Sequence, residues 1–155
     1  GTRGFILANP HESSTGSAVL LTQQDIRELQ LAKGAIFAGI QVLKKELGVT
    51  DEGIAKIYLA GAFGSYLNPA SAMRIGLIPA VPLKKVFSIG NAAGEGARLA
   101  LLSAREMERA AEIASGVRYV ELSVRADFQD HFIEAMNFPR SRLGGTRDKS
   151  LHRSD

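Results

Sequence analysis

The chain has 155 residues, of which 45% are hydrophobic and 23% are charged, a balance typical of a soluble globular domain. It contains no cysteine, which excludes a disulfide, a thiolate metal site and a cysteine-ligated iron–sulfur cluster within this chain. The sequence has neither an apolar run of roughly 18–20 residues nor a secretory start, so we expect a cytoplasmic protein without membrane contact.

The net charge of +3 comes from the end of the chain. Residues 140–155 carry five basic and two acidic side chains, which is +5 − 2 = +3, so the rest of the chain is balanced. We expect this segment to be a disordered tail behind a folded domain of residues 1–139. Nucleic-acid binding would need a basic stripe with aromatic residues on a folded face, so we do not expect it.

Two short apolar segments at the start of the chain predict a β-hairpin. They cover residues 4–8 and 17–21, and the residues between them, 9–16, are turn formers. We expect the hairpin to lie at the edge of a sheet. His11 in this loop has no second His or carboxylate cluster at metal-binding spacing, so we interpret it as a solvated loop residue.

The longest predicted helix begins at Thr22 and ends at Gly48. The Thr22 hydroxyl can cap the amide of Asp25, whose carboxylate suits the first turn of a helix. Gly34 and Gly39 lie inside this helix at a cost of about 1 kcal/mol each, which predicts the close approach of another helix or of a ligand. Apolar residues at three- and four-residue steps predict its buried face: Ile26, Leu29, Ala32, Ile36, Ile40, Leu43 and Leu47.

Two strand–turn–helix units follow. The first has a strand at 56–60, predicted to be buried on both faces, and a turn with Gly61 and Gly64 before a helix at 70–75 that Asn68 caps. The second has a strand at 86–89, the turn Gly90-Asn91 and a helix with little side-chain bulk. Parallel strands place such turns side by side at their carboxyl ends, where α/β proteins bind ligands. The residues therefore predict a glycine-lined cleft that would suit a nucleotide, although the spacing after Gly90 is not G-x-G-x-x-G.

The remaining segments predict structural roles. Ser103 is expected to cap a helix at 104–114, residues 119–122 to form the last strand, and residues 127–136 to form a closing helix. Phe128, Phe132 and Met136 share a face of that helix, which favours core packing over a cofactor contact. His131 and Asp130 lie on other sides of the helix, so we do not expect a catalytic pair. The chain contains no Gly-x-Ser-x-Gly elbow, no Gly-Lys-Ser/Thr phosphate loop and no His-Glu-x-x-His motif, so no catalytic or metal-binding residue is assigned.

Several segments resemble a known family. Residues 21–36, 59–67, 74–79 and 89–97, continued by 119–123 and 127–139, are similar to the carboxyl-terminal part of the ATP-dependent reductive activators of corrinoid proteins. The resemblance covers roughly residues 17–139. It implies an α/β fold, namely one lobe of an actin/sugar-kinase-like (ribonuclease H-like) ATPase domain with a mixed sheet flanked by helices.

The resemblance also implies a function. Members of that family carry a [2Fe–2S] cluster in an amino-terminal ferredoxin domain. They use ATP to drive an electron from this cluster to an inactive cobalt(II) corrinoid, which restores the cobalt(I) form that a methyltransferase needs. The implied partner is the corrinoid protein of a methyltransferase system, and the implied cofactor of this lobe is ATP or ADP with Mg²⁺.

Matched positions acquire implied roles. The turn after the first strand, with Gly61, Ala62, Phe63 and Gly64, would line the adenosine and nearby phosphate. The turn after the second strand, with Gly90 and Asn91, would form the neighbouring wall. Two side chains of the long helix, Gln30 and Lys33, would be nucleotide contacts.

The sequence also departs from the family. It lacks the Asp-x-Gly-Thr phosphate loops that hold magnesium, since Asp51-Glu52-Gly53 has no strand before it, and it lacks the cluster cysteines. We therefore expect a fragment, one ATPase lobe that alone neither hydrolyses ATP nor carries electrons. The alternatives are an interaction or dimerisation domain of the same fold without nucleotide binding, a homodimer being one such assembly, and a different kinase of the superfamily, which would need an acceptor pocket. A Phe63 ring filling the cleft would favour the first alternative.

Overall fold

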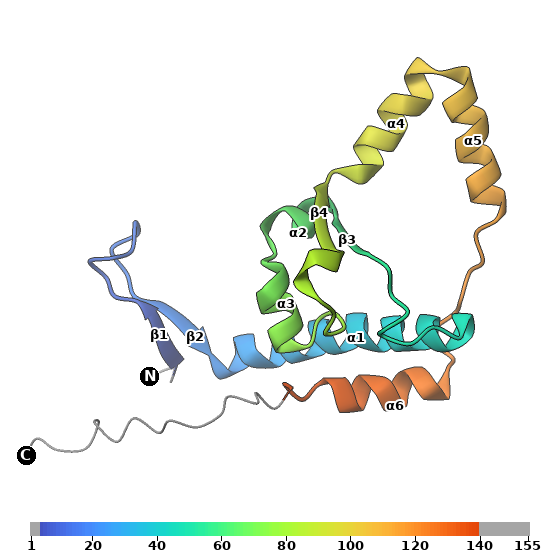
Figure 1. Ribbon diagram of the computed structural model, residues 1–155. Helices are drawn as coiled ribbons and strands as arrows, with labels where there is room; N and C mark the ends of the chain where they lie inside the picture. Colours follow the sequence, from blue (N-terminus) through green and yellow to red (C-terminus); the bar gives the residue numbers. More distant parts are fainter. Residues whose placement is uncertain (1–3, 140–155) are drawn as a thin grey trace, which may run out of the picture.

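The computed structural model describes residues 4–139, except for the side chain of Phe63. A hairpin stands at one end of a long helix, a two-stranded parallel sheet lies against the middle of that helix, and a helical arm leaves this sheet (Figure 1). The last helix returns along the long helix. The expected tail, residues 140–155, lies outside the described residues.

The predicted hairpin is confirmed, but its expected place at a sheet edge is wrong. Strand β1 (Gly4–Ala8) pairs antiparallel with β2 (Val19–Thr22), with Phe5 opposite Leu21. In the described part of the chain these strands form a sheet of their own, separate from the parallel pair β3–β4. Local alternation and turn residues define a hairpin, whereas its attachment to a sheet depends on strands elsewhere in the chain.

Helix α1 (Gln23–Leu47) has the predicted ends. Thr22 accepts a hydrogen bond from the amide of Asp25 at 3.2 Å, and the Asp25 carboxylate accepts one from the amide of Thr22 at 2.7 Å, which completes a capping box. The Thr22 hydroxyl, which donates to the Asp25 carboxylate at 2.7 Å, and then the Thr22 amide hold the pKa of Asp25 below its usual value. Gly48 ends the helix in the left-handed conformation, with φ of 62°.

Most of the predicted buried face of α1 is wrong, although Ile40 packs against the core. Leu29, Ile36, Leu43 and Leu47 are exposed. The buried residues are mostly small and lie on another face: Lys33, Gly34, Ala38, Gly39 and Val42. Helix α6 (Ala126–Ala135) packs there, because small residues let it approach closely.

The glycines of α1 show how close that approach is. A Cβ placed on Gly34 would lie 3.3 Å from the ring of Phe132, and one on Gly39 would lie 3.4 Å from Leu122. This confirms the expected approach of another helix at Gly34, whereas the neighbour of Gly39 lies in the irregular segment before α6. It also confirms core packing for Phe132, whose ring stacks on that of Phe128 at 6.2 Å between centroids.

Strands β3 (Ile57–Ala60) and β4 (Val86–Gly90) form the predicted parallel pair. One face of this sheet contacts a small core built from Ala72, Leu77 and Ile78, against which Leu59, Val86 and Ile40 pack. The other face is open, with the rings of Tyr58 and Phe87 exposed and 5.8 Å apart. The expectation that β3 is buried on both faces is therefore wrong within the described chain.

Two short helices follow β3. Helix α2 (Gly61–Tyr66) starts directly after the strand, and α3 (Pro69–Ile75) begins after Asn68, whose side chain accepts a hydrogen bond from the amide of Ser71 at 3.0 Å. A 3₁₀ turn, η1 (Leu83–Lys85), then leads into β4.

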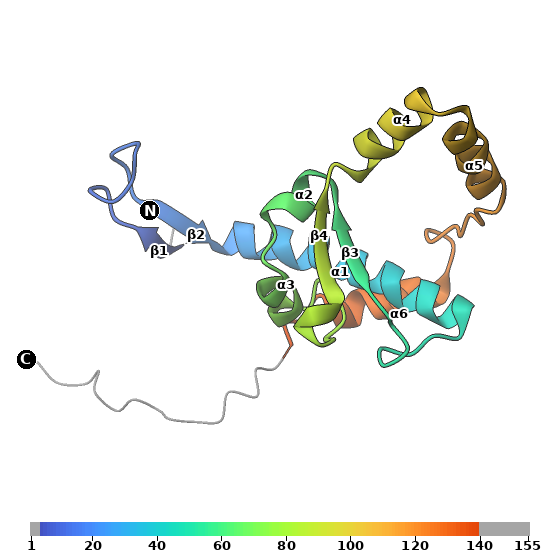
Figure 2. The same cartoon turned by 45° about the horizontal axis from the view of Figure 1, so that its top comes forward.

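Helices α4 (Ala92–Leu102) and α5 (Ala104–Ser115) form an arm that projects from the sheet (Figure 2). Ser103 turns the chain between them and accepts a hydrogen bond from the amide of Glu106 at 3.4 Å, as predicted. Helix α4 packs chiefly against α5 rather than against the sheet. No helix in residues 4–139 is long and apolar enough to cross a membrane.

The predicted strand at 119–122 is wrong. The segment between α5 and α6 is irregular. The Glu121 carboxylate accepts hydrogen bonds from the hydroxyl of Tyr119 at 2.6 Å and from the amide of Ser123 at 3.1 Å. Within the described chain no strand lies beside this segment, so its backbone has no hydrogen-bonded ladder to join.

Candidate functional site

The two turns predicted to form a cleft lie side by side. Ala60 at the end of β3 is paired with Gly90 at the end of β4, so both chains leave the sheet at the same edge. The Ser65 hydroxyl of α2 lies 3.9 Å from the position that a Cβ on Gly90 would occupy. We call the residues Gly61–Gly64, Gly90 and Asn91 the glycine edge.

Glycine suits positions 61 and 64 of α2 for different physical reasons. Gly61 has φ of 78°, and no neighbouring atom among the described side chains and backbone lies within 4 Å of the position that its Cβ would take, so its main chain faces open space there. A Cβ on Gly64 would lie 2.2 Å from the carbonyl oxygen of Leu59, so this glycine lets α2 pack on β3. Of these two glycines, Gly61 is therefore the one whose backbone a ligand could approach. Ala62 between them is exposed.

Asn91 is occupied as the cap of α4. Its side-chain oxygen accepts a hydrogen bond from the amide of Gly94 at 3.0 Å. A Cβ on Gly94 would lie 2.4 Å from the Asn91 amide nitrogen, so a larger residue there would have to displace the capping side chain. Gly90 reaches φ of 61°, which directs the chain away from the sheet into this cap.

The structure does not bring Gln30 and Lys33 to the glycine edge. Gln30 donates a hydrogen bond to the carbonyl of Met136 at 3.0 Å, and Lys33 donates to the carbonyls of Ala135 and Asn137. Both side chains line a groove between α1, α3 and α6, and no residue of the glycine edge lines that groove. The Lys33 side chain is 1% exposed, and this burial lowers the pKa of its ammonium.

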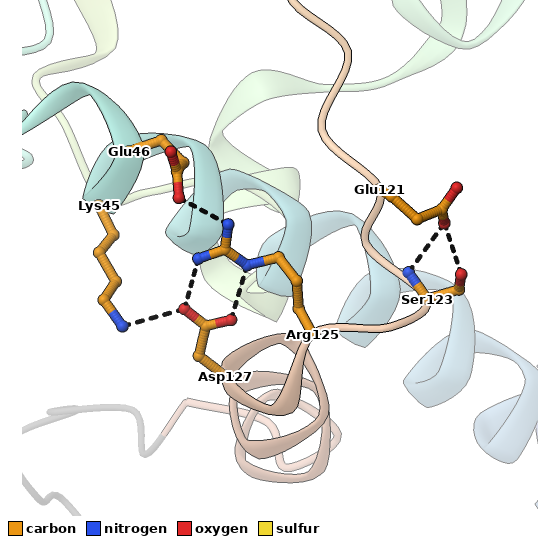
Figure 3. Close-up of polar contacts among 6 residues, drawn as sticks. All are labelled: Lys45, Glu46, Glu121, Ser123, Arg125 and Asp127. Carbon is orange, nitrogen blue, oxygen red and sulfur yellow. Dashed lines mark hydrogen bonds and ion pairs between the residues drawn. The ribbon is translucent and has the colours of Figure 1, made fainter.

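A polar clamp that sequence reasoning missed joins α1 to the start of α6 (Figure 3). Arg125 donates to Glu46 at 2.6 Å and to both carboxylate oxygens of Asp127 at 2.8 and 2.9 Å, and Lys45 contacts Asp127 at 3.0 Å. The Arg125 guanidinium, followed by Lys45, holds the pKa of Asp127 far below its usual value. The only local signal was the Arg-x-Asp pair before a predicted helix.

The described residues hold no group of three or more His, Cys, Asp or Glu side chains placed to bind a metal ion. Asp51, the nearest match to a phosphate-loop carboxylate, is paired with Lys44 of α1. Within the described residues, the glycine edge is thus formed largely by main chain and carries no cluster of metal-ligating side chains.

The parallel pair β3–β4 with its flanking helices makes this a mixed α/β domain, and the matching family model places it in the ASKHA class. The chain belongs to the family described as "C-terminal domain of RACo the ASKHA domain", which matches residues 1–146.

Relatives of known description agree with this family. The chain is 36% identical over 131 residues to the corrinoid activation enzyme RamQ of Eubacterium limosum, which covers 84% of this chain and 22% of that protein. It is 31% identical over 102 residues to the [Co(II) methylated amine-specific corrinoid protein] reductase of Methanosarcina barkeri, covering 66% of this chain and 19% of that one.

A solved structure shares the fold. A reductive activator for corrinoid, iron–sulfur protein superposes with a TM-score of 0.79 at 39% identity, covering 87% of this chain and 22% of the other. The chain thus spans about a fifth of the length of the relatives that it matches.

Proposed function

We propose that this chain is the nucleotide-binding lobe of a protein that uses ATP to reactivate a cobalt(II) corrinoid protein of a methyltransferase system. The relatives are described as corrinoid activation enzyme, corrinoid protein reductase and reductive activator, which supports the general role. The observation that carries nucleotide binding is Gly61, whose backbone faces open space at the edge where two parallel strands end.

In this proposal the nucleotide lies against the main chain of the glycine edge. Gly61, Ala62, Phe63 and Gly64 line the adenosine side, and Gly90 with Asn91 forms the neighbouring wall. A flat base or ribose can approach Gly61 because none of the described side chains stands between it and the backbone. Contact with Gln30 or Lys33 would require their hydrogen bonds to the end of α6 to be exchanged for bonds to the ligand.

The other cofactors are assigned to parts of a longer protein. This chain has no cysteine for a [2Fe–2S] cluster, and its described carboxylates are not gathered at the glycine edge. The proposal therefore places the cluster and the Mg²⁺ ligands on segments outside this chain. ATP hydrolysis would supply the free energy for the uphill electron transfer, and the contribution of this lobe is to bind and orient the nucleotide.

Calorimetric titration of the full-length protein with ATP and ADP in the presence of Mg²⁺ tests nucleotide binding. We expect saturable binding that Gly61→Val abolishes, because the new side chain occupies the open space. Gly16→Val is the matched control: Gly16 has a similar φ of 67°, equally open surroundings and a place in the distant hairpin loop. Equal binding by the parent and Gly61→Val, or equal losses in both variants, would contradict the assignment.

The partner is tested separately. Full-length protein immobilised on beads should retain the corrinoid subunit of a methyltransferase system, and Gly16→Val should leave that retention unchanged. If no corrinoid protein is retained, the corrinoid role fails even where nucleotide binding holds.

A second candidate function is an interaction or dimerisation domain without nucleotide binding. The arm favours it, since Leu101 and Leu102 are 83% and 69% exposed at its tip and Met107 of α5 is exposed as well. Light scattering on Leu101→Glu and the parent protein tests this candidate. A loss of dimers in the variant, together with no heat of ATP binding in the parent, would favour it over the first.

A further inference from the structure

The carbonyl end of helix α6 is capped by side chains of another helix. The last carbonyls of a helix have no partner within the helix and are usually satisfied by a local turn or by water. Here Lys33 donates to the carbonyl of Ala135 and, at 2.6 Å, to that of Asn137, while Gln30 donates to that of Met136 at 3.0 Å. Both donors belong to α1, about a hundred residues earlier in the chain.

The chain beyond these carbonyls continues across Lys33 to helix α3. The Lys33 ammonium lies 5.0 Å from the ring centroid of Phe138, a cation–π distance. Pro139 then packs on Gly76, the C-cap of α3: a Cβ on Gly76 would lie 2.9 Å from Pro139 Cγ and 3.6 Å from Lys33 Nζ. Residues 137–139 thus touch both α1 and the end of α3.

The buried ammonium and this segment depend on each other. An ammonium taken out of water is stable only where its donors are satisfied. Two N–H groups of Lys33 bond to carbonyls and its remaining direction is covered by the Phe138 ring. Without residues 137–139 the ammonium would lose Asn137 and Phe138, and without Lys33 the carbonyls of Ala135 and Asn137 would lose their donor.

We infer that residues 137–139 form a strap that fastens α6 and α3 to α1, with Lys33 as the latch. The strap opens and closes as a unit, because its polar contacts converge on one ammonium. Helix α3 follows α2 in the chain, and α2 carries the glycine edge, so the strap sets the position of the helix pair that supports that edge. This inference does not depend on nucleotide binding.

Hydrogen exchange on the unliganded protein tests the strap by comparing Lys33→Met with the parent. Methionine keeps the apolar stem and removes the donors. We expect amide exchange about tenfold faster or more at residues 132–138 and at Gly76 and Leu77, with no change in the hairpin or the arm. Lys44→Met is the matched control, since Lys44 lies on the same helix but pairs with Gln41 and Asp51 instead of the strap.

A second variant, Pro139→Ala, tests the strap independently if Lys33→Met does not fold. Pro139→Ala removes the contact with Gly76 and leaves the Lys33 bonds in place, so exchange should rise at Gly76 and Leu77 and stay low at Phe132. Acceleration that is uniform over the chain in both variants, or that matches Lys44→Met, would overturn the strap.

Discussion

Arg125 Nη1 lies 2.6 Å from Oε1 of Glu46, a residue that precedes it by 79 positions. The same guanidinium grips Asp127 with its other nitrogens, so one side chain joins the last turns of α1 to the first turn of α6 (Figure 3). Bidentate contacts of this kind are more directional than a single ion pair.

Arg125→Met should lower the melting temperature, because it leaves the half-buried carboxylates of Glu46 and Asp127 without their guanidinium partner. Removal of the Glu95–Arg98 pair by Arg98→Met is the control, since that pair is fully on the surface of the arm and such pairs contribute little. Circular dichroism melts of both variants check the difference. A melting temperature lowered equally by the two substitutions would show that the clamp contributes no more than an ordinary surface pair.

The clamp should make stability depend on pH in the acid range. The folded pKa of Asp127 is depressed by Arg125 and Lys45, so the folded state binds its proton less readily than the unfolded chain does. The stabilisation is therefore present above the unfolded pKa of about 3.9 and is lost as pH falls below that value towards the folded pKa. Urea unfolding at pH 6 and in steps below pH 4 should show the parent approaching Asp127→Asn. A constant difference between the two proteins would contradict this.

Gly34→Leu should destabilise the α1–α6 contact by about 1–3 kcal/mol, because its Cβ alone would come within 3.3 Å of the Phe132 ring. Ala35→Leu, one residue along on an exposed face, is the control and should change the free energy of unfolding by no more than about 0.5 kcal/mol. Chemical denaturation of both variants measures this. Equal free energies would mean that α6 does not sit on the glycine face.

Gly64→Ala and Gly96→Ala should act in opposite directions. A methyl group on Gly64 meets the Leu59 carbonyl oxygen at 2.2 Å, which only a backbone shift can relieve, so a loss of about 1–3 kcal/mol is expected. Gly96 lies inside α4 with nothing within 4 Å, so alanine there should gain up to about 1 kcal/mol of helix propensity. Thermal melts measure whether each substitution lowers or raises the melting temperature. A lower melting temperature for Gly96→Ala would contradict the open surroundings of Gly96.

Local chemistry was predictable from the sequence, whereas burial was not. Thr22, Asn68 and Ser103 begin helices, and Gly48 and Gly76 end them, because each acts within one turn of its own position. The parallel pair and its adjacent glycine turns followed from apolar runs and glycine spacing. The buried face of α1 did not follow, because periodicity weighs large apolar residues and the actual contact uses small ones.

For the candidate site too, the local features were predictable from the sequence and the contacts between distant segments were not. The sequence indicated that Gly61 and Gly90 would be neighbours, and the paired ends of β3 and β4 confirm this. Periodicity and spacing did not show that Gln30 and Lys33 hold the end of α6, or that Arg125 reaches Glu46, since both depend on segments far apart in the chain. The strand predicted at 119–122 is wrong because a strand needs a neighbour from elsewhere in the chain, and the described residues place none beside this segment.

The chain enters the arm directly after β4 and returns to α1 beyond α5, where Leu122 lies near Gly39 and Arg125 bonds to Glu46. Closing an excursion of chain costs free energy that grows only with the logarithm of its length, about 0.6 kcal/mol for each doubling. An added or deleted helical turn in α4 or α5 should therefore change the free energy of unfolding of the remaining structure very little. The arm is the natural place to graft a tag or a reporter domain while keeping β3, β4 and the α1–α6 pair intact.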